Sequence, residues 1–115
     1  MAQQPQPTEE PASLVVGDVL HVSDLDTGFS EKPKLRPCMI TKIFGHNVRV
    51  AGRSASGDQG VPVPRETLPG FDRDGVFFRP GARISLGLAN KSERLGVLPD
   101  PYKTQVLFYL NEDMP

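Results

Sequence analysis

The strongest constraint on the fold is a stiff cationic loop, residues 32–37 (KPKLRP), that leads directly into the apolar segment 38–43 (CMITKI). Proline biases the preceding residue toward extended backbone, so Arg36 is expected to be extended. Because proline is tolerated in a strand only at its start or at a sheet edge, Pro37 marks the beginning of a strand. The Arg36 guanidinium would then project from a fixed backbone, an arrangement suited to bidentate phosphate contacts.

The composition limits the class of protein. A chain of 115 residues is long enough for one small domain, and its 11 glycines and 12 prolines favour short strands and turns over a helical bundle. The net charge of −1 argues against nucleic-acid binding by bulk electrostatics, so any such binding needs a local basic patch.

The single cysteine excludes an intrachain disulfide and favours a cytoplasmic setting. Cys38 lies within an apolar run and is expected to be buried and unreactive. We expect no membrane span and no signal peptide, because the sequence has neither a long apolar stretch nor a basic start followed by an apolar core.

The apolar pattern predicts a mainly β domain with a C-terminal helix. Five or six short strands would close into a small barrel, which protects strand edges. Residues 1–13 and 112–115 are expected to be tails, with one domain at 14–111. The predicted strands are 14–26, 36–44, 48–54, 60–64, 76–79 and 82–86, with a possible helical turn at 90–95.

The sequence after residue 99 indicates a helix of about three turns. Asp100 is suited to the N-cap and Pro101 to the first helical position. Tyr102, Val106, Leu107 and Leu110 then form one apolar stripe, which must cover either the sheet or a partner subunit.

A tight turn at 45–47 predicts a hairpin between the second and third strands. This hairpin would return the chain so that Ser54 ends beside Arg36. Phe29 is either an anchor of the 27–35 loop or an exposed aromatic that stacks a base. The local basic patch is expected to consist of Lys32, Lys34, Arg36, Arg49 and Arg53.

Several kinds of site lack support in the sequence. Two histidines and one cysteine without ligand-like spacing predict no metal site, and we expect no cofactor. No glycine-rich phosphate loop precedes a helix. The groups able to act as acid or base are His21, Asp26 and Glu31, whereas His46, in the hairpin turn, is expected to be exposed and without function.

Four segments together resemble the PemK/MazF-like toxins of type II toxin–antitoxin systems. The segment 17–22 (GDVLHV) is similar to the family's opening strand, and 34–37 (KLRP) to its Arg-Pro strand. The segment 50–54 (VAGRS) lies where the family has an apolar strand ending in Thr or Ser. Residues 84–96 resemble its last strand and a following turn with Arg-Leu-Gly.

The resemblance implies an SH3-like barrel that forms a homodimer and is neutralised by a cognate antitoxin. It also implies a metal-independent endoribonuclease that cuts single-stranded mRNA through attack by the 2′-hydroxyl. Arg36 and Ser54 match the family's catalytic positions. In this interpretation Arg36 stabilises the phosphorane, Ser54 bonds a non-bridging oxygen, and Lys32, Lys34, Arg49, Arg53 and Phe29 bind RNA.

Two alternatives come from other functional classes. A non-enzymatic member of the same barrel would act by binding a protein target such as DNA gyrase, as the CcdB-type toxins do. An SH3-like interaction module would have no toxicity.

Overall fold

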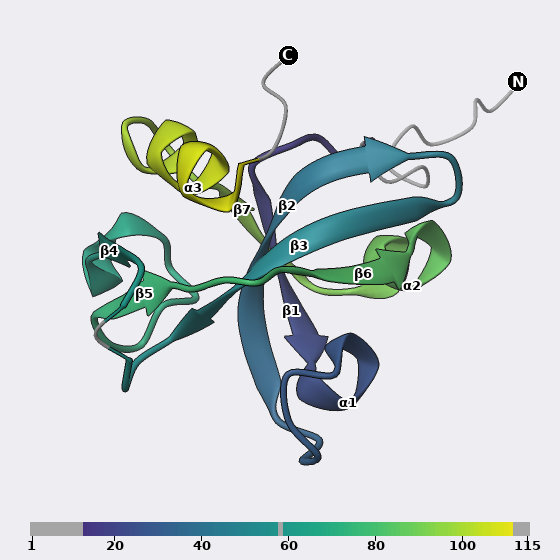
Figure 1. The fold of residues 1–115 in the computed structure, drawn as a ribbon, viewed down its shortest axis with the longest axis horizontal. Coiled ribbons are helices and arrows are strands. Elements are labelled where there is room, and N and C mark those ends of the chain that lie inside the picture. Colours follow the sequence, from purple (N-terminus) through teal and green to yellow (C-terminus); the bar gives the residue numbers. More distant parts are fainter. Residues whose placement is uncertain (1–12, 58, 112–115) are drawn as a thin grey trace, which may run out of the picture.

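The structure is a computed structural model that describes residues 13–57 and 59–111. These residues form one curled antiparallel sheet with short helices at its edges (Figure 1). Neighbouring strands follow the order β4-β5-β3-β2-β1-β7, and β6 also pairs with β3. The elements are β1 (Asp18–Ser23), α1 (Asp24–Thr27), β2 (Leu35–Phe44), β3 (Asn47–Ser54), β4 (Val61–Val63), the 3-10 turn η2 (Arg65–Thr67), β5 (Gly75–Phe77), β6 (Ala82–Ser85), α2 (Leu86–Lys91), β7 (Arg94–Val97) and α3 (Tyr102–Leu110).

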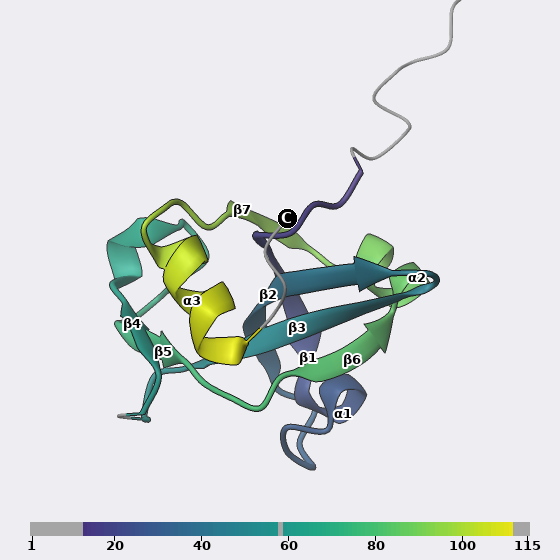
Figure 2. The same cartoon turned by 45° about the horizontal axis from the view of Figure 1, so that its top comes forward.

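Strand β3 gives the sheet its curvature because it has different partners along its length. Its first half, from Asn47 to Val50, pairs with β6, whereas Arg53 and Ser54 pair with β5. The two partners diverge from the β2–β3 hairpin, and the sheet curls into a half-barrel (Figures 1 and 2). The prediction of a small, mainly β, barrel-like domain with a terminal helix is therefore confirmed.

Strands β1, β2 and β3 contribute alternate residues to two separate cores, one on each face of the sheet. In β1, Val19 belongs to one core and Leu20 to the other. The first core is completed by β4, β5 and α3, and the second by β6 and α2. The residues of the first are Val19, Met39, Ala51, Val61, Val63, Phe71, Phe77, Leu98, Val106 and Leu107. Those of the second are Leu20, Val22, Cys38, Ile40, Val48, Val50, Ile84 and Ala89.

Helix α3 packs against its own sheet. Val106 and Leu107 are buried in the first core, and Tyr102 and Leu110 lie against it, so the predicted stripe is confirmed and covers the domain that carries it. The helix begins at Tyr102, one residue later than predicted. The Asp100 carboxylate still satisfies the first turn, since it accepts hydrogen bonds from the Thr104 backbone and hydroxyl.

Two predicted boundaries are wrong. The first strand does not run from 14 to 26: it occupies Asp18–Ser23, and the Ser23 hydroxyl then caps the short helix α1. The predicted helical turn at 90–95 is instead the end of α2 followed by β7. The seventh strand therefore comes from a segment whose extended backbone depends on pairing with β1.

The predicted tails lie outside the described residues except for Ser13. The part of the chain that the structure describes contains no helix with the length and apolar character of a membrane span. Burial raises the pKa of the Cys38 thiol to about 12, so this thiol is protonated and inert at neutral pH, as predicted.

Candidate functional site

Arg36 is held at the start of β2 by a buried carboxylate. Its Nε and Nη2 donate to the two carboxylate oxygens of Asp24, both at 2.7 Å, and its Nη1 donates to the Arg53 carbonyl at 3.1 Å. Asp24 is fully buried, and the Arg36 side chain is 13% exposed. The hydrogen bond from Arg36 lowers the pKa of Asp24, and the same bond raises that of Arg36. Both groups are therefore charged at neutral pH, and the positive charge of Arg36 is matched locally.

Two aromatic rings enclose the Arg36 guanidinium. The centroids of the Phe29 and Phe78 rings lie 5.8 and 5.4 Å from its central carbon, and the two rings meet edge to face at 5.0 Å. A Cβ built on Gly52 would lie 2.7 Å from each of these rings, so the enclosure depends on glycine at that position. Of the two interpretations of Phe29, the structure favours the anchor of the 28–34 loop.

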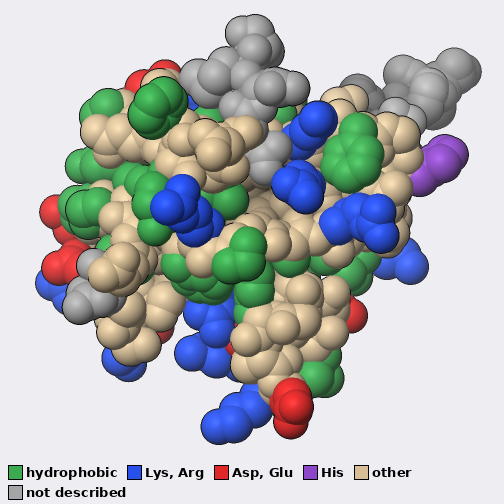
Figure 3. Space-filling model, in the orientation of Figure 1, with side chains coloured by type: hydrophobic (Ala, Val, Ile, Leu, Met, Phe, Trp, Pro, Cys, Tyr) green, Lys and Arg blue, Asp and Glu red, His purple; other side chains and the backbone are tan. Residues whose placement is uncertain are grey.

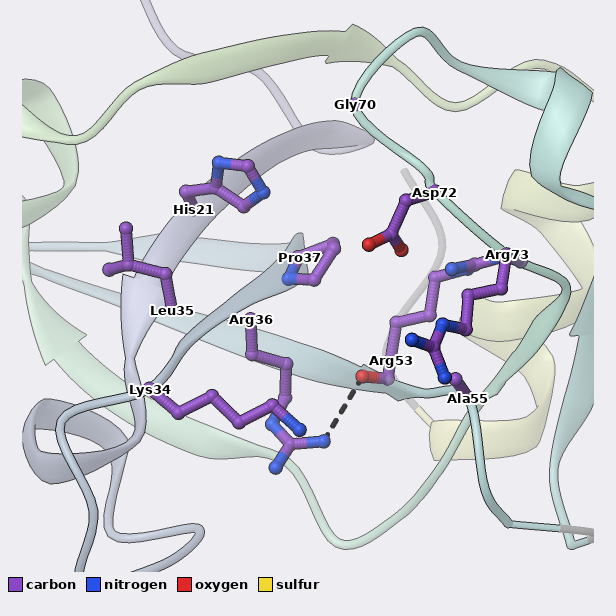
Figure 4. Close-up of a pocket in the computed structure, with 10 residues that line it drawn as sticks. All are labelled: His21, Lys34, Leu35, Arg36, Pro37, Arg53, Ala55, Gly70, Asp72 and Arg73. Atoms are coloured by element: carbon purple, nitrogen blue, oxygen red, sulfur yellow. Dashed lines mark hydrogen bonds between the residues drawn. The ribbon is translucent and has the colours of Figure 1, made fainter.

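Arg36 borders a groove of about 320 Å³, which we call the main groove (Figure 4). In Figure 4, His21 and Pro37 lie on one side and the chain from Gly70 to Arg73 on the other. The groove is lined by His21, Lys34, Leu35, Arg36, Pro37, Arg53, Ala55, Gly70, Asp72 and Arg73. The positive charges outnumber the one carboxylate that lines this groove, so it is suited to an anionic ligand.

His21 enters the main groove from β1, opposite Pro37 in the sheet register. Its Nδ1 lies 2.9 Å from Glu93 Oε1, and its backbone N–H donates to the Glu93 carbonyl. When Nδ1 carries the proton and donates it to Glu93, the ring's other nitrogen, Nε2, is left with a free lone pair. Of the three predicted acid–base residues, His21 is the one that lines the main groove.

Ser54 lies at the end of β3 and borders a second hollow, of about 360 Å³, that it shares with Arg36 and Phe78. Its hydroxyl accepts the Ser56 backbone N–H at 3.2 Å and lies 3.3 Å from the Ser56 hydroxyl. The hairpin thus brings Arg36 and Ser54 to one hollow, as its register requires, while the Ser54 hydroxyl caps the turn that follows β3.

Arg53, predicted to bind RNA, is buried. Its Nη2 donates to the carbonyls of Val63 and Arg73, both at 2.7 Å, and its guanidinium stacks at 3.9 Å on the Phe71 ring. Desolvation by burial lowers its pKa, but an arginine side chain stays protonated in a protein. These bonds hold β4 and the 71–74 segment against β3, so the guanidinium of Arg53 has a structural role.

The remaining predicted residues do not gather in the main groove. Asp26 and Glu31 are exposed on α1 and the following loop, and Lys32 is exposed beside them. Arg49 lies near the opposite end of the hairpin, in a hollow with Lys42, Phe44 and Arg83. The five cations of the predicted patch are therefore divided: Lys34, Arg36 and Arg53 line the main groove, Arg49 lies in a separate hollow, and Lys32 lines neither of the two.

Three side chains that sequence reasoning missed complete the site: Asp24, Glu93 and Arg73. Asp24 follows Ser23, a helix N-cap residue, and this local signal marks a turn at the end of β1. No local pattern links Asp24 to Arg36 or Glu93 to His21, which is 72 residues away.

No family model, curated protein or solved structure matches this chain. Among residues 13–57 and 59–111, no three His, Cys, Asp or Glu side chains gather where they could hold a metal ion.

Proposed function

We propose that this protein is a metal-independent endoribonuclease that binds and cuts single-stranded RNA in the main groove. The observation that carries the proposal is that His21, which Glu93 orients, shares this groove with Lys34, Arg36 and Arg73. Cleavage through the RNA's own 2′-hydroxyl needs a base for that proton and cations for the phosphate, and both are present in the groove.

The reaction assigns a step to each group. His21 Nε2 accepts the 2′-hydroxyl proton, the 2′-oxygen forms a bond to phosphorus, and the bond from phosphorus to the 5′-oxygen breaks. The products are a 2′,3′-cyclic phosphate and a 5′-hydroxyl, whose proton comes from solvent. Lys34 and Arg73 stabilise the charge on the phosphorane, which is commonly the largest catalytic term.

Arg36 has a narrower role than the sequence suggested. Its donors to Asp24 and to the Arg53 carbonyl occupy three of the five N–H groups of a guanidinium. The other two N–H groups are not used in these three bonds. In the proposed complex they donate to the phosphate from a fixed position. We therefore assign proton transfer to His21, whereas the sequence had placed the catalytic roles on Arg36 and Ser54.

The same activity supports a physiological proposal. An unregulated ribonuclease that cuts mRNA arrests growth, so a cell that makes this chain needs a protein that covers the main groove. That protein would be the cognate antitoxin of a type II toxin–antitoxin system, in agreement with the family resemblance of the sequence.

A second candidate is a non-enzymatic barrel that acts by binding another protein. It is favoured by the Arg36–Asp24 pair, because a guanidinium that is neutralised by a buried carboxylate and enclosed by Phe29 and Phe78 also serves well as an interior clamp. In that case growth arrest would not depend on the groove's acid–base chemistry.

The test is cleavage of end-labelled single-stranded RNA by the purified protein in the presence of a chelator. We expect 2′,3′-cyclic phosphate ends, and we expect His21→Asn to lower the cleavage rate by at least about 100-fold, the usual minimum for loss of a general base. His46→Asn is the matched control because His46 is exposed in the β2–β3 turn. Equal rates for both variants would contradict the proposal, and growth arrest that survives His21→Asn would favour the second candidate.

A further inference from the structure

Three cationic side chains are aligned across the adjacent strands β2, β3 and β6. Lys42 on β2 is the register partner of Arg49 on β3, and Arg49 is the register partner of Arg83 on β6. Direct partners lie about 5 Å apart on the same face of a sheet. All three residues are exposed. We call Lys42, Arg49 and Arg83 the cation row.

A bulge in β2 creates this alignment. The register shifts between Ile40, which pairs with Val50, and Lys42, which pairs with Arg49, so Thr41 is the extra residue. An extra residue changes which side chains face outward beyond it. The bulge therefore brings Lys42 into line with Arg49, where regular pairing would have placed Thr41.

Lys42 and Arg83 occupy the two ends of the row, and both side chains are exposed. Around it, none of the described residues that line the two adjoining hollows is acidic. Arg79 borders the second hollow together with Arg49, and its guanidinium donates to the Tyr109 carbonyl. Lys and Arg side chains gather over β2, β3 and β6 in Figure 3. Lys42 and Arg83 are therefore placed to contact an anionic ligand in the hollow that both of them line.

An aromatic ring lies next to the row. Phe44 lines a hollow of about 700 Å³ together with all three members of the row, and the Lys42 ammonium lies 5.9 Å from the centre of its ring. Phe44 is half-buried and borders this hollow, where a ligand can reach it. Cations that track a phosphate backbone beside an aromatic ring that stacks a base are the two parts of a single-strand binding surface.

We propose that the cation row and Phe44 form a second binding surface, which takes the phosphate backbone and one base of single-stranded RNA. Lys42 lies six residue steps along β2 from Arg36, or about 20 Å, so this surface is distinct from the main groove. An acidic peptide would satisfy the cations equally well but would leave the Phe44 ring without a role. The inference concerns binding and holds whether or not the main groove cuts RNA.

The experiment measures binding of a fluorescent oligothymidylate of roughly 12 nucleotides. This probe has no 2′-hydroxyl and cannot be cut by the proposed reaction. The variant Lys42→Gln/Arg83→Gln removes both ends of the row, and Arg65→Gln, on the exposed turn η2, removes one cation elsewhere. We expect the double variant to raise Kd at least about tenfold in 50 mM salt and to reduce the salt slope, d log K/d log[salt], by about 1.4, which corresponds to two phosphate contacts. Arg65→Gln should change neither quantity.

The variant Phe44→Leu separates the two possible occupants. It should weaken oligothymidylate binding about fivefold or more through lost stacking and leave the salt slope unchanged. An oligoglutamate of equal charge that displaces the probe at equal concentration, together with an inert Phe44→Leu, would overturn the proposal in favour of an acidic protein segment.

Folding of each variant is checked by thermal melting, where the double variant should melt close to the wild type because both substituted side chains are exposed. Should the double variant melt lower, Lys42→Gln alone should still reduce the slope by about 0.7. An unchanged slope in a folded variant contradicts the proposal. A protein that binds oligothymidylate through the row but cuts no RNA would reject the ribonuclease proposal and leave this one standing.

Discussion

Asp24 and Arg36 form a two-pronged ion pair that ties the first turn of α1 to the start of β2. Both N–O distances are 2.7 Å, and the pair closes the loop that carries Phe29 and Ser30. The Ser30 hydroxyl donates to the same Asp24 oxygen that accepts from Arg36 Nη2, so the carboxylate organises both ends of the loop. Lys34 of this loop lines the main groove, so the pair also helps to fix one wall of that groove.

The variant Asp24→Asn should destabilise the protein strongly. It leaves the Arg36 charge in a mostly buried position without its counter-ion, and such a loss typically lowers the free energy of unfolding by about 3–5 kcal/mol. Urea denaturation at pH 7 measures the change. Asp26→Asn, an exposed position in the same helical turn, is the matched control and should stay within about 0.5 kcal/mol of wild type. Similar values for the two variants would show that the pair is not needed for folding.

Stability should fall in acid as this pair is lost. The pKa of Asp24 is lower in the folded protein than its ordinary value of 3.8. The pair's contribution is therefore complete well above pH 3.8, and it declines as the pH falls through 3.8 toward the folded pKa. The difference in unfolding free energy between wild type and Asp24→Asn should be constant from pH 7 to about 5 and should shrink below pH 4.

The hydrogen bonds with Thr104 also lower the pKa of Asp100. Because the wild type and Asp24→Asn both contain Asp100, its effect cancels in this difference. Urea titrations of both proteins at several pH values between 7 and 3 measure it. A difference that stays constant down to pH 3 would mean that Asp24 does not carry the dependence.

Gly52 should not tolerate a side chain. A Cβ at this position would meet the rings of Phe29 and Phe78 at 2.7 Å and the Arg36 side chain at 3.1 Å. Displacing packed rings typically costs about 1–3 kcal/mol of unfolding free energy, so Gly52→Ala should be destabilising. Gly87→Ala in α2 is the control, because nothing lies within 4 Å of its added methyl group. The control should be neutral or stabilising by up to about 1 kcal/mol. Denaturation curves that rank the two variants in the reverse order would contradict the packing around Arg36.

The sequence predicted the elements whose signals are local. Pro37 placed the start of β2 within one residue, and the alternation of Val48 and Val50 indicated the buried face of β3. The Asp100 cap located α3, because helix starts depend on side chains within one turn.

The partners of the site residues could not be predicted, because they come from strands that meet only in the folded chain. Glu93 reaches His21 through the pairing of β7 with β1, and β7 itself lacks the alternation of a strand. Asp24 reaches Arg36 by the closure of a loop that no local pattern specifies. The cation row was likewise hidden, since its alignment depends on a bulge at Thr41 that changes the register.

Glu93 should act as a positioning residue for His21. Its carboxylate holds Nδ1 at 2.9 Å, so the lone pair that the proposed base needs is fixed on Nε2. Glu93→Ala frees the ring to rotate and to exchange tautomers, which should lower kcat for RNA cleavage about tenfold or more and leave KM nearly unchanged. Glu66→Ala is the control, since Glu66 is exposed on η2 and does not line the main groove. Steady-state rates on one labelled RNA give both constants. A rise in KM at constant kcat would instead assign Glu93 to substrate binding, and an unchanged kcat would remove the reason for choosing His21 over other bases.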